Sequence, residues 1–176
     1  LKCFPRLLTL LPEASLLVVG SGPFEDALKS IASGLGLHNK VTFAGHVFSK
    51  ERLTQMISKC AVGLAPYVPT SYEPYAFPSK ALEYMSCGLP VILTGVQTFA
   101  QMVAERKAGI VISYDEDQLV EAIRRLLSDD TLYIEYRNNA IKLAENYMCD
   151  RLFMKAFARM VNKVGLQGEG FGRAGA

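Results

Sequence analysis

The sequence predicts an α/β fold: a Rossmann-like, three-layer α/β/α arrangement around a doubly wound parallel sheet. Short, continuously apolar runs, often β-branched, alternate with longer segments of helical periodicity. The short runs lack the alternation of a half-exposed strand, which indicates strands covered on both faces. The chain has 176 residues, and 50 % of them are hydrophobic. It is therefore long enough to form one domain with a substantial core.

Five apolar runs are the predicted strands, at residues 15–20, 41–45, 61–66, 90–94 and 109–113. In sheets of this kind, ligands bind beyond the carboxyl ends of the strands. The loops that follow the strands are therefore the places where chemistry is expected, at residues 20–24, 45–49, 66–78, 94–97 and 113–115.

Helical periodicity and helix start and stop signals predict the remaining elements. The helix over 24–34 is expected to place Leu28, Ile31 and Ala32 on one face. The full set of predicted helices covers residues 1–11, 24–34, a segment that starts at 49, and residues 78–87, 97–106, 115–127, 130–146 and 149–164.

The end of the chain differs in composition from the rest. The last twelve residues contain five glycines, so we expect a domain over residues 1–164 and a flexible tail over 165–176. No apolar run reaches the roughly 18 residues that a membrane span needs. The first residues lack the pattern of a signal peptide, so none is expected.

Cysteine and histidine usage narrows the class of protein further. The four cysteines are scattered without a CxxC pair, which favours reduced thiols and a cytoplasmic location. The two histidines, His38 and His46, form no cluster with cysteine, so no metal is expected. The body of the chain has no basic face interleaved with aromatic residues, so nucleic acid is not an expected partner.

Two of the loops offer candidate ligand contacts. Gly20 and Gly22 stand between a strand and a helix, where backbone amides can approach a phosphate. Glu25 occupies the third glycine position of the dinucleotide fingerprint, so a tight turn without a ligand is an equal alternative. His46 and Val47 follow the second strand, and His46 either meets a base or phosphate or is simply packed or solvated.

The third loop and the helix after it are the most informative segment. Because the helix begins at Pro78, the free amides of Ser79 and Lys80 and the helix dipole favour an anion there, and Lys80 adds a positive charge. Glu83 lies one turn beyond Ser79 on the same face. Its carboxylate could accept hydrogen bonds from the ribose of a nucleotide whose phosphates bind at the start of the helix. The alternative is a solvated surface helix that stops at Gly88.

Taken in order, several segments resemble the C-terminal, donor-binding half of a GT-B-fold, family 4-like retaining glycosyltransferase, over roughly residues 5–162. The resemblance implies that the full protein moves a sugar from a nucleotide diphosphate sugar to an acceptor with retention of configuration, in surface polysaccharide or glycolipid synthesis. It implies no cofactor and no metal. The matching segments are 16–23 (LLVVGSGP), 41–45 (VTFAG), 61–66 (AVGLAP), 78–84 (PSKALEY), 88–91 (GLPV) and 108–111 (AGIV).

Only some of the family's donor-binding residues have a matching residue in this sequence. Of two motif glutamates, the second, which binds the ribose, falls on Glu83, whereas the first, which binds the sugar, falls on Tyr75. Glu73 lies two positions too early. The resemblance places the diphosphate on the amides of the loop and the base on the second loop, and supplies no catalytic base or nucleophile within this chain. The expected donor-binding residues are Tyr75, Ala76, Phe77, Ser79, Lys80, Glu83, His46, Val47, Gly20 and Gly22.

The resemblance also implies parts that precede this sequence. In the family, a central strand followed by an Arg and a Lys comes before the first helix, and an N-terminal domain binds the acceptor. We therefore expect the chain to need that domain as a partner and to be inactive alone. In the family's strand order, 3-2-1-4-5-6, loss of the first strand leaves two arrangements. Either the strand over 15–20 pairs with the strand over 61–65, or a gap leaves two unpaired edges.

Two other functions stay open. A non-catalytic nucleotide-binding module would tolerate Tyr75 in place of the first motif glutamate. A UDP-sugar 2-epimerase-like enzyme would need acidic and histidine residues in the cleft, for which only Glu73 and His46 are available.

The last predicted helix carries a basic row beside an apolar stripe. The row is either solvated or makes peripheral contact with the inner face of an anionic membrane. It consists of Arg151, Lys155, Arg159 and Lys163.

Overall fold

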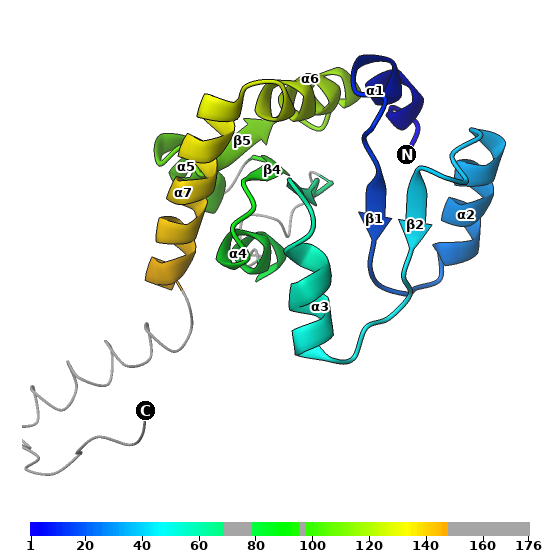
Figure 1. Cartoon of the computed structure of the whole chain (residues 1–176), viewed down its shortest axis with the longest axis horizontal. Coiled ribbons are helices and arrows are strands. Elements are labelled where there is room, and N and C mark those ends of the chain that lie inside the picture. Colours follow the sequence, from blue (N-terminus) through cyan, green and yellow to red (C-terminus); the bar gives the residue numbers. More distant parts are fainter. Residues whose placement is uncertain (69–78, 96–97, 148–176) are drawn as a thin grey trace, which may run out of the picture.

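Short parallel strands alternate with helices in the computed structural model, which describes residues 1–68, 79–95 and 98–147 (Figure 1). The predicted helix over 149–164 and the tail over 165–176 lie outside these residues. All five predicted strands form, at Leu16–Val18 (β1), Val41–Phe43 (β2), Gly63–Ala65 (β3), Val91–Thr94 (β4) and Gly109–Ile112 (β5). The helices are Phe4–Leu10 (α1), Glu25–Gly34 (α2), Lys50–Ile57 (α3), Ser79–Ser86 (α4), Thr98–Glu105 (α5), Glu116–Leu127 (α6) and Asp130–Tyr147 (α7).

The strands form two separate parallel sheets. β1 pairs with β2, with Leu16 opposite Val41, and β3, β4 and β5 pair in that order, with Gly63 opposite Val91. β1 and β3 do not pair with each other. The sequence left open whether these two strands pair or are separated by a gap. In the structure they are separated by a gap.

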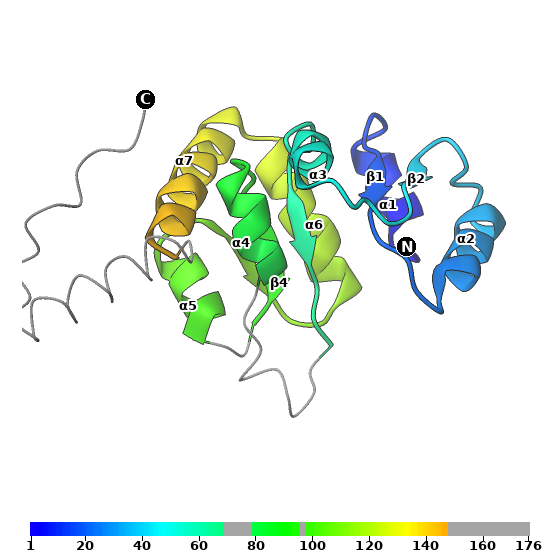
Figure 2. The same cartoon turned by 90° about the horizontal axis from the view of Figure 1, so that it is seen from below.

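The gap lies where the chain reverses its direction across the fold. From β1 the chain moves outward to β2, returns through α3 to β3, and then moves outward the other way through β4 to β5 (Figures 1 and 2). Such a reversal is the topological switch point of a doubly wound sheet, where ligands of this architecture bind.

Helices cover both faces of the larger sheet, which gives the predicted three layers. α4, α5 and α7 pack on one face, and α1 and α6 pack on the other (Figures 1 and 2). Successive residues of β4 point to opposite faces. Val91 and Leu93 therefore join the first core and Ile92 joins the second, and all three are at most 2 % exposed.

Two local features position the helices around the gap. A Cβ atom at residue 63 would lie 2.5 Å from Cδ2 of Tyr84, so glycine at this position lets α4 pack closely on β3. Asp115 caps α6, because its Oδ1 atom accepts a 2.8 Å hydrogen bond from the amide of Gln118. The cap sets the start of the helix that supports the far side of the larger sheet.

α2 is more exposed than its apolar pattern predicts. Ala32 is buried, but Leu28 and Ile31 are each 37 % exposed. Of the three residues predicted to share one helix face, only Ala32 is therefore buried. The physical reason is that α2 belongs to a sheet only two strands wide, which offers too little surface to cover the apolar stripe.

Candidate functional site

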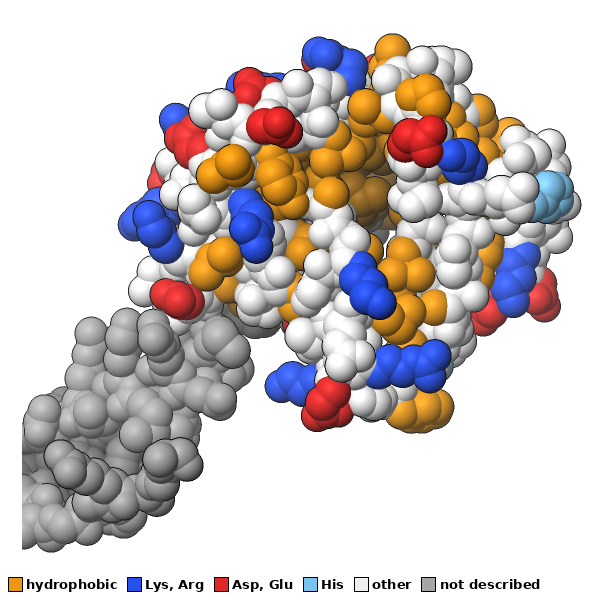
Figure 3. Space-filling model, viewed as in Figure 1, with side chains coloured by type: hydrophobic (Ala, Val, Ile, Leu, Met, Phe, Trp, Pro, Cys, Tyr) orange, Lys and Arg blue, Asp and Glu red, His pale blue; other side chains and the backbone are white. Residues whose placement is uncertain are grey.

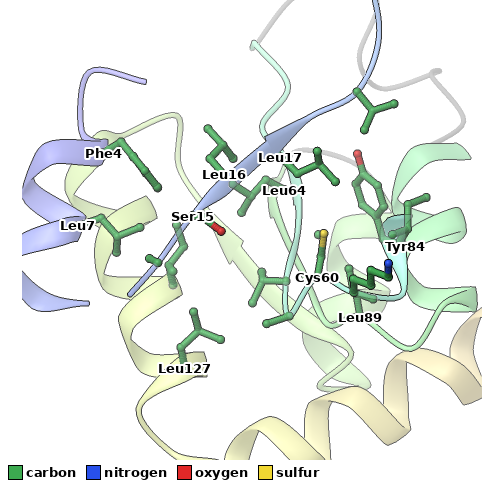
Figure 4. Close-up of a pocket in the computed structure, with 18 of the residues that line it drawn as sticks. Phe4, Leu7, Ser15, Leu16, Leu17, Cys60, Leu64, Tyr84, Leu89 and Leu127 are labelled. Carbon is green, nitrogen blue, oxygen red and sulfur yellow. The ribbon is translucent and has the colours of Figure 1, made fainter. Parts of the chain in front are cut away.

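A cavity of about 820 Å³ opens between the two sheets, at the switch point. Figure 3 shows it as a hollow with apolar side chains at its bottom. In Figure 4, Leu7 of α1, Leu17 of β1, Leu64 of β3 and Leu127 of α6 are among the side chains around it. The volume falls within the range of ligand pockets, about 300–1,000 Å³.

Five of the predicted site residues line this cavity. Gly20, His46 and Val47 come from the loops that follow β1 and β2, and Lys80 and Glu83 come from α4. The first three belong to the smaller sheet, whereas α4 packs on the larger one. The two halves of the predicted site therefore meet across the gap.

The other predicted residues are not all at the cavity. Gly22 and Ser79 are exposed and do not line it. Tyr75, Ala76 and Phe77, which the resemblance places next to the donor, lie outside the described residues. No part of the structure tests their roles.

α4 has a buried side and a side that borders the cavity. Ala81 and Met85 are fully buried against α5 and α7, and this leaves Lys80 and Glu83 exposed, one turn apart. The cavity thus has a cation and a carboxylate on the same helix face, close to a helix N-terminus that favours anions.

Tyr84 is a cavity residue that the sequence analysis did not select. It lines the cavity and packs over Gly63. Burial, followed by the nearby charge of Glu83, raises the pKa of the Tyr84 phenol. The hydroxyl is therefore a neutral hydrogen-bond donor at physiological pH. Its position beside Glu83 in the sequence is the signal that could have identified it.

The loops after β1 and β2 are tied together at the rim of the cavity. The amide of Gly20 donates a 2.8 Å hydrogen bond to the carbonyl oxygen of Gly45. Both residues have positive φ, which glycine adopts without strain. The ring of His46 makes an edge contact with Phe48, at 4.3 Å between centroids. Phe48, which the sequence analysis did not select, is itself 92 % exposed.

A hydroxyl group fixes the chain where it leaves β3. Thr94, the last residue of β4, donates a 2.7 Å hydrogen bond from Oγ1 to the carbonyl oxygen of Tyr67. The same oxygen accepts a 2.8 Å bond from the Tyr67 amide. This pair of bonds holds Tyr67 at the carboxyl edge of the larger sheet, two residues before the segment that precedes α4.

The cavity has groups that can bind an anion joined to a hydroxylated ring: a lysine, a carboxylate and an exposed imidazole. Within the part of the chain that the structure describes, no three His, Cys, Asp or Glu side chains are grouped so that they could hold a metal ion. No helix among residues 1–68, 79–95 and 98–147 is long and apolar enough to cross a membrane.

Comparison with known families decides the class of the protein. The family described as glycosyl transferases group 1 matches residues 1–129. The chain belongs to this family of glycosyltransferases. The match includes both loops of the smaller sheet and all of α4, so the five cavity residues lie within the glycosyltransferase domain.

Relatives and solved structures agree with this assignment. The glycosyltransferase chain is 29 % identical over 154 residues to an uncharacterised glycosyltransferase of Methanocaldococcus jannaschii, which covers 86 % of this chain and 38 % of the relative. WaaG, a glycosyltransferase involved in lipopolysaccharide biosynthesis, is 25 % identical with a TM-score of 0.66, over 82 % of this chain and 38 % of WaaG.

The pneumococcal O-GlcNAc transferase GtfA, solved with UDP and GlcNAc, has a TM-score of 0.73 at 22 % identity, over 94 % of this chain and 32 % of GtfA. At that identity the likeness shows the fold, and it confirms the Rossmann-like α/β prediction. The glycosyltransferase chain spans less than half the length of each of these three proteins.

Proposed function

We propose that this chain is the donor-binding, C-terminal half of a GT-B, family 4-like retaining glycosyltransferase. The full protein would transfer a sugar from a nucleotide diphosphate sugar to an acceptor held by an N-terminal domain. The observation that carries the proposal is the meeting of Lys80 and Glu83 with Gly20, His46 and Val47 around one cavity at the switch point.

Each residue has a role that follows from its chemistry. The Glu83 carboxylate accepts hydrogen bonds from the ribose hydroxyls. Lys80 and the free amides at the start of α4 hold the diphosphate. His46 and Val47 contact the base. Stabilising the departing diphosphate and orienting the sugar would supply most of the catalysis, without a metal ion.

The comparisons support the classes of donor and acceptor in this proposal. GtfA, which shares the fold, was solved with UDP and GlcNAc. WaaG takes part in lipopolysaccharide biosynthesis. We therefore propose a surface polysaccharide or glycolipid acceptor, and an enzyme that works in the cytoplasm at the inner face of the membrane.

A substitution at Glu83 tests the donor site. In the full-length protein, Glu83→Gln keeps the shape of the side chain but removes the charge. A hydrogen bond to a charged group contributes about 1.5–3 kcal/mol, so we expect nucleoside diphosphate binding, measured by calorimetry, to weaken about ten-fold or more. Glu105→Gln, on α5 and away from the cavity, is the matched control. Equal affinities for both variants would remove Glu83 from the site.

One observation favours a second function. Tyr75 stands where the resemblance expects a sugar-binding glutamate, which suits a nucleotide-binding module without transferase activity. Donor turnover by the full-length protein separates the two functions. Binding of a nucleotide sugar without release of nucleoside diphosphate would favour the module.

A further inference from the structure

The phenol ring of Tyr84 is held in one place beside the cavity. Its backbone is fixed near the end of α4, where its carbonyl oxygen accepts hydrogen bonds from the amides of Cys87 (3.1 Å) and Leu89 (3.0 Å). Its ring lies against the backbone of β3, because a Cβ atom at Gly63 would come within 2.6 Å of Cβ, Cγ and Cδ2 of Tyr84. Packing therefore sets the position of the hydroxyl group at the end of the ring.

The hydroxyl group of Tyr84 is available to a ligand. In Figure 4 the ring points away from α4 into the cavity, with the hydroxyl oxygen at its tip. Within the part of the chain that the structure describes, that oxygen makes no hydrogen bond. By contrast, the hydroxyl of Tyr133, on α7, donates a 3.1 Å hydrogen bond to the carbonyl oxygen of Ala61. A tyrosine hydroxyl usually has a hydrogen-bond partner when its ring is buried, and the cavity is where a ligand could supply one.

Tyr84 shares its face of α4 with Lys80. Residues four apart on a helix lie one above the other, whereas neighbours in sequence do not face each other. The phenol is therefore aligned with Lys80 rather than with Glu83. Long side chains in a helix also point back toward its N-terminus, which carries the Tyr84 hydroxyl toward the turn that contains Lys80. Both side chains line the cavity.

This helix face thus presents two hydrogen-bond donors. The Lys80 ammonium group has three N–H donors and no acceptor. The Tyr84 phenol stays protonated at physiological pH and can donate, because burial and the nearby charge of Glu83 raise its pKa. A cation and a neutral donor on one face fit a phosphate group, which is an anion with several acceptor oxygens. The Glu83 carboxylate is an acceptor and suits the hydroxyl groups of a ribose instead.

We propose that the Tyr84 hydroxyl is a phosphate-binding group, which donates a hydrogen bond to an oxygen of the same diphosphate that Lys80 contacts. The inference rests on the proposed function, which supplies the identity of the ligand. It adds a neutral donor to the charged lysine, held in place before the ligand arrives by the contact between the ring and Gly63.

Removing the hydroxyl in the full-length protein tests the proposal. Tyr84→Phe keeps the ring that packs over Gly63 and removes only the donor. We expect binding of UDP and GDP, measured by calorimetry, to weaken about ten-fold, because the lost hydrogen bond is to a charged group. Binding of uridine and guanosine should be nearly unchanged. Equal losses for nucleosides and nucleoside diphosphates would place the hydroxyl at the ribose or the base and overturn the proposal.

A second tyrosine provides the matched control. Tyr133→Phe also removes one hydroxyl, but from α7 and away from the cavity, and it should bind all four ligands like the parent protein. Circular dichroism spectra and urea midpoints that match the parent show that Tyr84→Phe folds. A folded Tyr84→Phe variant that binds UDP and GDP as tightly as Tyr133→Phe does would overturn the proposal.

Inorganic pyrophosphate separates failure of this inference from failure of the proposed function. We expect the parent protein to bind pyrophosphate, and Tyr84→Phe to bind it about ten-fold more weakly. A parent protein that binds pyrophosphate through Tyr84 but binds neither nucleotide would contradict the donor function and support the phosphate contact. A parent protein that binds UDP or GDP as tightly as Tyr84→Phe does would contradict the phosphate contact and leave the donor function in place.

Discussion

The two sheets of this chain are built from the same kind of β-α unit, yet they differ in how well they are buried. β4 has a strand on each side and helices on both faces, and its first three residues are almost fully buried. β1 has one neighbour, and all three of its residues are only half-buried. β4, with neighbours on both sides, is therefore buried along its length, whereas β1 is not.

The comparison extends to the candidate site. The well-packed half supplies Lys80 and Glu83, on a helix held by buried side chains of α5 and α7. The less packed half supplies Gly20, His46 and Val47 from loops. The proposed phosphate and ribose contacts thus rest on the better-packed half, and the proposed base contact rests on the half that the gap leaves less supported.

Glycine substitutions in the two halves should show the largest difference. A Cβ atom at residue 109 would collide with the backbone carbonyl oxygen of Val91 in β4. Gly109→Ala is therefore expected to destabilise the chain by about 3 kcal/mol. A Cβ at Gly34, in α2, meets nothing within 4 Å, and Gly34→Ala should stabilise by about 0.5–1 kcal/mol. Urea unfolding of both variants measures the two changes in stability. Similar midpoints for the two variants would contradict the difference in packing between the two halves.

The separate binding roles proposed for the two halves of the site can be tested on the full-length protein. Lys80→Ala should weaken UDP or GDP binding about ten-fold and leave binding of the corresponding nucleoside nearly unchanged, because the lysine pairs with the diphosphate. His46→Ala should weaken nucleoside and nucleoside diphosphate by the same, smaller factor. Calorimetry with the four ligand and variant combinations measures this. Equal losses for both ligands in the lysine variant would contradict a phosphate role.

The smallest expected effect concerns the exit from β3. Thr94→Val has nearly the same shape but loses both hydrogen bonds to Tyr67. Each such bond contributes about 1 kcal/mol net. We expect a small loss of stability and a several-fold weaker affinity for nucleoside diphosphate, since Tyr67 begins the chain that leads to α4. Thr94→Ser retains the hydroxyl and should bind like the parent protein. If valine and serine variants have the same affinity, Thr94 does not position the site.

The sequence alone determined most of the elements and half of the site. Continuous apolar runs predicted all five strands, because a strand buried on both faces needs apolar residues at every position. The spacing of Ser79 and Glu83 predicted that they share one helix face, because helical periodicity is local, but at the cavity it is Lys80 and not Ser79 that accompanies Glu83. The loops after the first two predicted strands offered Gly20, His46 and Val47, and the structure brings all three to the same cavity.

Contacts between distant segments needed the tertiary structure. Leu28 and Ile31 carry the pattern of a buried helix face, but their exposure depends on the width of the sheet beneath α2, which no local pattern encodes. Phe48 and Thr94 became visible only through contacts with His46 and Tyr67. The gap itself is decided by which strands pair. Pairing is a property of neighbours in space, so the sequence left two arrangements open and the structure chose between them.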